Sequence, residues 1–465
     1  MLGRLLGRRG RHKVFVIGLD CAEPSLLFGR YAADLPNLSR LLAQGRHGPL
    51  ESTIPAITVP AWAAMFSGRD PGELGFYGFR NRADYSYEKM RIATAADISV
   101  PRVWDLASEA GKRVAVVGVP QTYPIRPVNG LMVSGFLTPS TRSEYTWPAE
   151  LKDEIRELVG DYAVDVQPFR TDHKEQLLAQ IQAMTEQHCQ VVKHLLGKKR
   201  WDLFVWVEIG VDRIHHGFWK YGDPAHPQYQ PGNPFERAMH DYYIYLDGQI
   251  GEMLALLPKD TTILVLSDHG GQPMMGGFCI NEWLIQRGYL VLKEQPEGIA
   301  RLEDCHVDWE RTRAWASGGY YARVFLNVAG REPQGVVPMA QYAQFREQLA
   351  AELQATTDHQ GQPMGTRAFR PEDVYRHVNK IPPDLIVYLG NLAWRSVGSV
   401  GHGTVHVFEN DTGPDDANHA QNGLYIATGG HPSPEPTPRT WRAVAPSILE
   451  SLGITAPEWM GAERL

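Results

Sequence analysis

Short runs of apolar and β-branched residues recur along the chain, separated by longer segments with apolar residues at helical spacing. The first run, KVFVIGLD at residues 13–20, is followed by a polar break and then by a helical pattern. Runs of the same kind lie at residues 112–120, 201–210, 261–270 and 423–430. An unbroken apolar run of this length is typical of a strand that is buried on both faces, so each run predicts one strand.

The segments between these runs predict helices. The clearest are residues 35–45, 148–160, 174–196 and 235–257, in which apolar residues return every three or four positions. Alternating buried strands and amphipathic helices predict an α/β fold with a mainly parallel sheet and helices on both faces. In such folds ligands bind beyond the carboxyl ends of the strands.

The pattern changes after residue 275, where strand-like and helix-like segments are mixed. We expect residues 276–399 to form an inserted cap, which leaves residues 13–275 and 400–465 as the α/β catalytic core. Residues 1–12 form a basic N-terminal arm in this scheme. The stretch 398–423 is rich in Gly, Asp and Asn, and it predicts a long functional loop.

Composition limits the classes of function. The 465 residues are 43% hydrophobic and 21% charged, as in a globular protein with a large core. The net charge of −7, without a basic patch interleaved with aromatic residues, disfavours nucleic acid as the main partner. The 4 cysteines are widely spaced and form no C-x-x-C pair, so neither a disulfide framework nor a thiolate zinc site is predicted.

The N-terminal sequence MLGRLLGRRGRHK is basic but lacks the apolar core of a secretory signal. No run of about 18 apolar residues is available to cross a bilayer. The sequence therefore predicts a cytoplasmic protein without a transmembrane segment, and it leaves the oligomeric state open.

Carboxylates and imidazoles follow the carboxyl ends of three predicted strands. Asp20 ends the first run, Asp212 and His216 follow the third, and Asp268 and His269 follow the fourth. The i, i+4 spacing of Asp212 and His216 places both on one face of a helix, where they can hold one ion. Taken singly, each pair also fits a helix cap or an ordinary polar turn. Their coincidence at one edge of one sheet predicts a metal site.

Thr58 lies at the start of another predicted helix, two residues before Pro60. Proline in the first turn favours a helix start, and a helix N-terminus offers free N–H groups to an anion. Thr58 is therefore either a helix cap or a nucleophile; sequence alone favours the cap, and the two roles are compatible. Glu208 is close in sequence to two predicted ligands and is a candidate for orienting one of them; a buried hydrogen bond explains it equally well. Tyr320 and Tyr321, in the sequence GGYY, are candidates for lining a pocket for a base or sugar ring, and structural packing is at least as good an explanation.

These segments together resemble the alkaline phosphatase superfamily, in its branch of type I phosphodiesterases and nucleotide pyrophosphatases. The matching stretches lie in the family's order over most of the chain: VFVIGLD, STIPAITVPAWAAMFSG, VEIGVDRIHHGFW, LVLSDHG, GFCINEWLIQRGYL and NHAQNGLYIATGG. The resemblance implies an alkaline phosphatase-like core and an enzyme that hydrolyses phosphoric esters of small molecules.

The resemblance also implies two divalent metal ions, Zn²⁺ with Mn²⁺ as the alternative. The ligands of the first ion would be Asp212, His216 and His419, and those of the second would be Asp20, Asp268, His269 and Thr58. Thr58 would attack phosphorus, and water would hydrolyse the resulting phosphothreonine. His419 is preferred over His402 and His406 because it directly precedes a predicted strand, as in relatives.

The chain departs from its relatives where substrate is bound. Many nucleotide pyrophosphatases have P-x-x-H-G followed by a phosphate-binding Asn, whereas this chain has PGELG at residues 71–75. The nearest candidate is Asn81, which is offset from the expected position. Sulfatases need C/S-x-P-x-R, and the sequence TVPAW at residues 58–62 disfavours that activity.

Three functions remain open. The first is a phosphodiesterase-like phosphohydrolase, which is favoured by the threonine and the complete ligand set. The second is a phosphotransferase or phosphomutase on the same scaffold, which would need a closed, dry pocket. The third is a non-catalytic metal-binding protein, which would be expected to have lost the nucleophile or a ligand.

Overall fold

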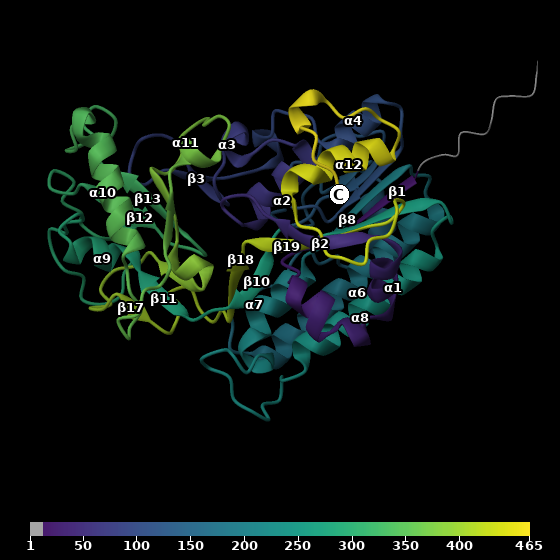
Figure 1. Ribbon diagram of the computed structural model, residues 1–465, viewed down its shortest axis with the longest axis horizontal. Coiled ribbons are helices and arrows are strands. Elements are labelled where there is room, and N and C mark those ends of the chain that lie inside the picture. The colour runs from purple at the N-terminus through teal and green to yellow at the C-terminus, as the bar shows by residue number, and fades with distance from the viewer. Residues whose placement is uncertain (1–12) are drawn as a thin grey trace, which may run out of the picture.

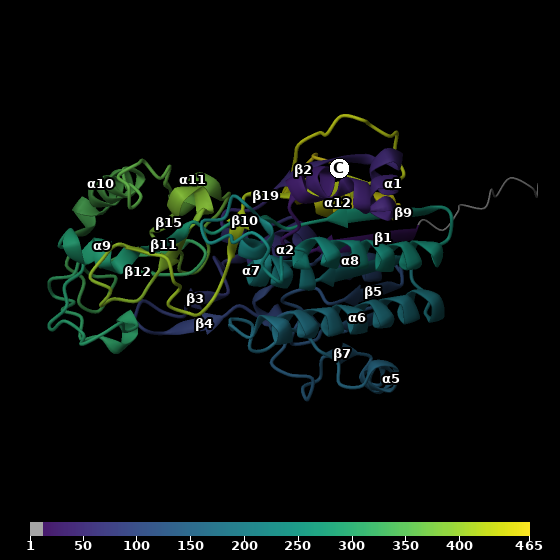
Figure 2. The ribbon, with the colours of Figure 1, turned by 90° about the horizontal axis from the view of Figure 1, so that it is seen from below.

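The computed structural model describes residues 13–465, and its centre is a nine-stranded sheet with the order β20-β2-β19-β9-β1-β8-β5-β6-β7 (Figures 1 and 2). Its parallel middle strands are β9 (Thr261–Leu266), β1 (Lys13–Leu19), β8 (Leu203–Glu208), β5 (Val114–Val117) and β6 (Gly130–Val133). This confirms the predicted α/β class. The predicted basic arm at residues 1–12 lies outside the described residues.

Four further strands extend the sheet at both edges. These are β19 (Asn422–Ala427), β2 (Arg46–Glu51), β20 (Arg439–Thr440) and β7 (Thr146–Trp147). β19 runs antiparallel to both β9 and β2, and β7 runs antiparallel to β6. All five strands predicted from apolar runs belong to this sheet, because each run is buried on both sides.

Helices cover both faces of the sheet, as Figure 1 shows. One face carries α1 (Pro36–Gln44), α5 (Leu151–Val159), α6 (Lys174–Lys198), α7 (Gly210–Gly222) and α8 (Ala238–Ala255). The other face carries α2 (Thr58–Ser67), α4 (Val103–Glu109) and α12 (Val444–Ser451). Along β1, Phe15, Ile17 and Leu19 pack on the first group, whereas Val14 and Val16 pack on the second. None of the described helices is long and apolar enough to cross a membrane.

Residues 276–407 form a second lobe, at the left of Figure 1. One of its sheets has the order β12-β13-β15-β14: β12 (Ala314–Ser317), β13 (Ala322–Leu326), β15 (Leu385–Tyr388) and β14 (Arg367–Phe369). The other has the order β16-β11-β17: β16 (Trp394–Val397), β11 (Gly276–Cys279) and β17 (His406–Val407). Its helices are α9 (Ile280–Gln286), α10 (Tyr342–Gln354) and α11 (Pro371–Val374). The predicted boundaries of a cap at residues 276–399 stay a prediction.

A hairpin of β3 (Arg80–Arg82) and β4 (Met90–Ile92) follows α2 and the short helix α3 (Pro71–Leu74), and it contacts the second lobe. Arg82 Nη1 lies 3.0 Å from Glu332 Oε1, and the ring of Tyr87 stacks on Trp309 with centroids 3.6 Å apart. The hairpin therefore links the second lobe to the helix that begins at Thr58.

The stretch 398–423, predicted as a loop, contains the strands β17 and β18 (Ala417–Ala420). β18 pairs antiparallel with β10 (Gly270–Pro273), with Gly271 opposite His419. Because β10 follows His269 directly, this pairing brings His419 to the end of β9. The composition of the stretch resembles a loop, and only long-range pairing makes these residues strands.

Glu208, the last residue of β8, is fully buried and fixes the start of α7. Its Oε1 accepts hydrogen bonds from Gly210 N at 2.8 Å and Thr185 Oγ1 at 3.2 Å, and its Oε2 lies 3.0 Å from His188 Nδ1. Burial opposes a charge on His188, but the Glu208 carboxylate outweighs burial and raises the pKa of that imidazole. Glu208 thus has a structural role that positions the helix with two predicted ligands.

We expect His188→Gln to lower the free energy of unfolding by about 3 kcal/mol at pH 6 and by less at pH 9. Because the folded pKa of His188 is raised, its contribution is complete below the ordinary value of about 6.5 and is lost as pH rises through the folded value. Urea unfolding at both pH values measures the difference. His194→Gln, at a more exposed pair with Glu154, is the control. A loss of stability that grows with pH would contradict this account.

Candidate metal centre

Five of the predicted ligands converge at the carboxyl edge of the central sheet. Asp20 follows β1, Asp268 and His269 follow β9, and Asp212 and His216 lie on α7 just after β8. All five are buried. Because β9, β1 and β8 are parallel neighbours, their ends meet at one edge, and residues far apart in the sequence come together.

Asp20, Asp268 and His269 form one candidate cation site. His269 Nε2 lies 3.7 Å from Asp20 Oδ1 and 3.3 Å from Asp268 Oδ2. Trp62 Nε1 donates to Asp20 Oδ2 at 2.8 Å, and Cys21 N donates to Asp268 Oδ1 at 3.2 Å. The remaining oxygen of each carboxylate is buried without a hydrogen-bond partner. His269 Nδ1 donates to a backbone carbonyl at 3.1 Å, so its Nε2 faces the carboxylates.

A second group of ligand atoms surrounds Asp212. The Oδ1 atom of Asp212 lies 3.2 Å from His216 Nε2 and 4.0 Å from His419 Nε2. This oxygen and His216 Nε2 are buried without hydrogen-bond partners. Asp212 belongs to two overlapping candidate sites, one with His269 and His419 and one with His216 and Cys21. The structure thus brings all six predicted Asp and His ligands together, and their division between two ions stays a prediction.

The pKa values of the three carboxylates shift in different directions: two are raised and one is lowered. Burial, reinforced by the charge of Asp212, raises the pKa of Asp20. Burial and the charge of Asp20 raise the pKa of Asp268. Burial also acts on Asp212, but the positive charges of His216 and Arg213 outweigh it and hold the pKa of Asp212 well below its usual range. The cluster therefore lacks positive charge on the side of Asp20 and Asp268.

The donor set fits a divalent cation. Buried oxygens without partners are costly, and a cation among them would satisfy all of them at once. Burial lowers the pKa of His269 to about 4, and it also lowers the pKa of His419. Both imidazoles are therefore neutral at neutral pH, which is the form that binds metals. Mixed carboxylate and imidazole ligands suit Zn²⁺ and Mn²⁺.

Thr58 is the first residue of α2, and its hydroxyl faces this cluster. Its Oγ1 lies 3.3 Å from His269 Nε2, and the residue is 3% exposed. The N-cap of the helix is Ile57, and α2 has no side-chain cap hydrogen bond. Thr58 therefore does not cap the helix, although the sequence alone favoured that role. Its hydroxyl lies at the helix N-terminus, beside the N–H groups of the first turn that have no partner within the helix.

Thr58, Asp212 and His419 open into a cavity of about 350 Å³. Five arginines line it: Arg80, Arg170, Arg213, Arg323 and Arg395. Phe79, Phe136, Phe169, Tyr320 and Tyr321 supply aromatic walls. A wall with this much positive charge favours an anionic ligand, and guanidinium groups match the oxygens of phosphate.

Asn81 does not line this cavity. Its Oδ1 accepts from Tyr77 N at 2.6 Å, and its Nδ2 donates to the carbonyl of Gly78 at 2.9 Å. The side chain thus closes a local turn before β3. A role for Asn81 in substrate binding stays a prediction.

Asp415 is a buried residue of the site that the sequence did not reveal. Its Oδ1 lies 2.7 Å from His216 Nδ1, and its Oδ2 accepts from Tyr320 OH and Arg170 at 3.1 Å and from Arg395 Nη1 at 3.3 Å. A carboxylate behind a metal-binding histidine fixes the orientation and tautomer of the ring. The Asp-rich loop was predicted to be functional, but which of its acids points inward depends on the pairing of β18.

Comparisons with known proteins show the family and the fold of the chain. The family model for type I phosphodiesterase / nucleotide pyrophosphatase matches residues 14–415. Phosphonoacetate hydrolase from Sinorhizobium meliloti 1021, in complex with phosphonoacetate, is 17% identical over 90% of both chains, with a TM-score of 0.59. An inactive threonine-to-alanine variant of murine ectonucleotide pyrophosphatase / phosphodiesterase 5, in complex with AMP, is 12% identical over 96% of both chains, with a TM-score of 0.53. These structures share the fold, and the comparison with curated proteins found no match.

Removal of metal ions should lower the melting temperature, and more so at higher pH. Asp20 and Asp268 have raised pKa values, so their contribution to the metal-free fold is complete below the ordinary value of about 4 and is lost as pH rises. A bound cation takes the place of those protons, so its stabilisation grows with pH. Thermal unfolding of protein treated with EDTA or loaded with Zn²⁺ or Mn²⁺, at pH 5.5 and 8, tests this. A metal-dependent difference that shrinks as pH rises would refute it.

Asp415→Asn should weaken metal binding by about 10–100-fold, because His216 loses the charge that orients its ring. Competition with a fluorescent chelator measures the affinity. Asp416→Asn is the matched control, since this neighbouring buried carboxylate pairs with Lys220 at 3.2 Å rather than with a predicted ligand. Equal losses in the two variants would rule out a specific role for Asp415.

Proposed function

The chain belongs to the type I phosphodiesterase / nucleotide pyrophosphatase family of phosphoric ester hydrolases, and from this we propose that it cleaves small-molecule phosphodiesters through Thr58. The observation that carries the proposal is the place of the Thr58 hydroxyl. It lies 3.3 Å from His269 Nε2, beside buried ligand atoms without partners and at the wall of a cavity lined by arginines. A nucleophile, a cation site and an anion-binding wall thus meet at one point.

In this function the candidate metal centre would hold two divalent ions, Zn²⁺ with Mn²⁺ as the alternative. The ligands of one would be Asp212, His216 and His419, because Asp212 Oδ1 lies 3.2 Å from His216 Nε2 and 4.0 Å from His419 Nε2. The ligands of the other would be Asp20, Asp268, His269 and Thr58. When bound, such ions stabilise the negative charge that develops around phosphorus and make a coordinated hydroxyl more acidic. The anchored oxygens of the three carboxylates hold the ligand positions in place.

The residues of the chain orient the reaction. The Thr58 hydroxyl gives up its proton to solvent as its oxygen forms a bond to phosphorus. The bond to the departing ester oxygen breaks on the opposite side, and that oxygen takes up a proton and leaves as an alcohol. Water then forms a bond to phosphorus while the bond from phosphorus to the Thr58 oxygen breaks. One proton of that water restores the Thr58 hydroxyl, and a phosphate monoester is released from the diester. Arg213 and Arg170 supply positive charge at the same cavity, and their carboxylate partners keep both guanidinium groups in place.

The complexes of the neighbouring structures support a phosphorus oxyanion as ligand, because one contains phosphonoacetate and the other contains AMP. The inactive form of the murine protein has alanine in place of a threonine. A second candidate, a phosphotransferase or phosphomutase, is favoured by the depth of Thr58, which is 3% exposed. A buried nucleophile allows an acceptor alcohol to exclude water.

Thr58→Ala should reduce turnover of bis-p-nitrophenyl phosphate by at least about a thousandfold, because no other group replaces the nucleophile. Release of p-nitrophenolate by protein loaded with Zn²⁺ or Mn²⁺, compared with p-nitrophenyl phosphate, measures the rates. Acid quenching during turnover should yield a peptide with one phosphoryl group on Thr58.

Thr53→Ala is the matched control, because Thr53 is equally buried in the same segment but donates only to the carbonyl of Pro55 at 2.7 Å. It should keep turnover and yield the same phosphopeptide. Undiminished hydrolysis by Thr58→Ala would exclude the covalent route. Turnover of neither ester by wild-type protein with bound metal, together with phosphoryl transfer to an added alcohol, would favour the transferase.

A further inference from the structure

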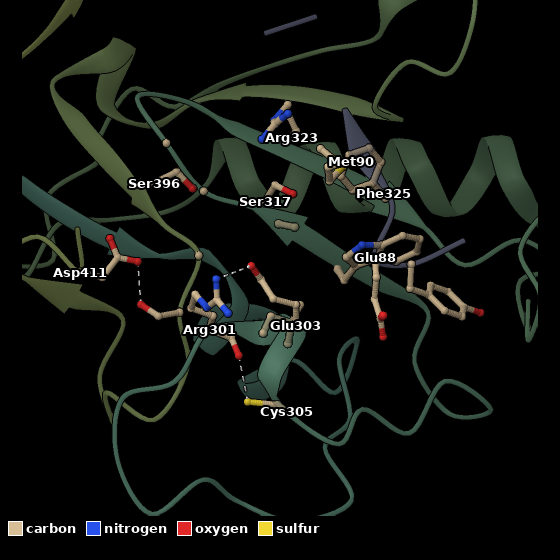
Figure 3. Close-up of a pocket in the computed structure, with 18 of the residues that line it drawn as sticks. Glu88, Met90, Arg301, Glu303, Cys305, Ser317, Arg323, Phe325, Ser396 and Asp411 are labelled. Atoms are coloured by element: carbon tan, nitrogen blue, oxygen red, sulfur yellow. Dashed lines mark hydrogen bonds and ion pairs between the residues drawn. The ribbon is translucent and has the colours of Figure 1, made fainter. Parts of the chain in front are cut away.

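Figure 3 shows a second cavity, of about 500 Å³. It adjoins the cavity at Thr58, because residues of one wall line both. The two cavities share five lining residues: Arg80, Gly318, Gly319, Arg323 and Arg395. The shared wall therefore consists of three arginines and two glycines. It lies where the β3–β4 hairpin meets the second lobe.

The two glycines are needed for close backbone contact at this wall. A Cβ atom on Gly318 would lie 2.5 Å from Gly398 N and 2.6 Å from the carbonyl oxygen of Ser396. Gly319 has a φ of +145° and exchanges backbone hydrogen bonds with Ser396 at 2.8 and 2.9 Å. No side chain from this turn separates the cavities, so the arginines are the groups that a ligand meets between them.

Three of the arginines at the first cavity already have carboxylate partners. Arg170 and Arg395 lie 3.1 and 3.3 Å from Asp415 Oδ2. Arg213 contacts Asp165 through two nitrogens, at 2.7 and 2.9 Å. Their charges help to position the site, and each is at least partly balanced.

Arg80 and Arg323 differ from these three. Within residues 13–465, no carboxylate lies within ion-pair distance of either guanidinium group. Arg323 instead donates to the backbone carbonyl of Arg80. Arg80 is exposed and Arg323 is partly buried. Burial lowers the pKa of Arg323, the nearby Tyr321 opposes this shift, and the charge of Arg80 adds to it.

Two buried polar atoms on β16 also lack hydrogen-bond partners at this wall. Arg395 Nε and Ser396 Oγ have no hydrogen-bond partner, and these residues are 4% and 1% exposed. Both residues line the second cavity. In Figure 3, Ser396, Ser317 and Arg323 lie on one side of that cavity, opposite the segment with Arg301. Buried donors without partners are costly unless a ligand satisfies them.

We propose that the shared wall is a subsite for a second anionic group, a carboxylate or phosphate on one ester arm of the substrate. Arg323 and Arg80 supply the unbalanced positive charge, and Ser396 and Arg395 supply further donors. The inference rests on the proposed function and narrows its substrate class to phosphodiesters with an additional negative charge a few bonds from the reacting phosphorus. A diester without that charge leaves Arg323 unpaired.

The test compares two esters that differ only in this charge, p-nitrophenyl propyl phosphate and p-nitrophenyl 2-carboxyethyl phosphate. Wild-type protein loaded with Zn²⁺ or Mn²⁺ should have a kcat/KM at least about tenfold higher for the carboxylated ester, the effect of one hydrogen bond between charged groups. In Arg323→Met the ratio should fall to about one, and Arg323→Lys should restore part of it. A folding defect would lower both rates and leave the ratio unchanged.

Arg301→Ala is the matched control. Arg301 lines the second cavity, but Asp304 balances its charge through contacts at 2.8 and 3.0 Å, so this variant should keep the wild-type ratio. Equal kcat/KM values for both esters in the wild type, or a ratio that survives in Arg323→Met, would overturn the subsite and leave the proposed hydrolase standing. Turnover of neither ester would overturn the proposed function, and the subsite with it.

Discussion

Three carboxylates buried within one cluster are the constraint on which the rest of this structure depends. Asp20, Asp212 and Asp268 each have one oxygen held by a donor, from Trp62, Arg213 or a backbone N–H, and one oxygen without a partner. The free oxygens face the same space because β9, β1 and β8 end side by side. A cation in that space would balance the repulsion, so the same arrangement that opposes folding without an ion would favour binding of a metal ion.

Asp415 lies between a group of carboxylates and a group of arginines. On one side lie the carboxylates and imidazoles of the candidate metal centre, and on the other lie the arginines of the cavity. Asp415 contacts both sides, through His216 and through Arg170 and Arg395. With a cation bound among the carboxylates, a phosphate group between the two sides would meet positive charge from both, which suits a reaction in which negative charge builds up around phosphorus.

The sequence predicted those parts of the molecule in which local pattern and position coincide. Apolar runs predicted four of the five parallel middle strands and missed β6. The polar residues just beyond those strands predicted Asp20, Asp212 and Asp268, because parallel strands bring their carboxyl ends to one edge. Asp415 and Arg323 escaped prediction, since nothing in their local sequence distinguishes them from surface residues. Their positions depend on the pairing of β18 with β10 and on the contact of the hairpin with the second lobe. The role of the Thr58 hydroxyl could not be decided from the sequence, because it depends on the backbone geometry, which places Ile57 at the N-cap.

The candidate metal ligands and the arginines of the cavity belong to different parts of the fold. The carboxylate ligands are fixed by hydrogen bonds around the central sheet. The orientation of His216, by contrast, depends partly on the far wall of the cavity, because Asp415 contacts both His216 and Arg395. That wall combines Arg80 of the hairpin with Arg323 and Arg395 of the second lobe. A charge altered there changes which ester arm fits while the carboxylates keep their positions. In the proposed function, the central sheet would therefore position the reacting phosphorus, and the contact between the hairpin and the second lobe would select the remainder of the substrate.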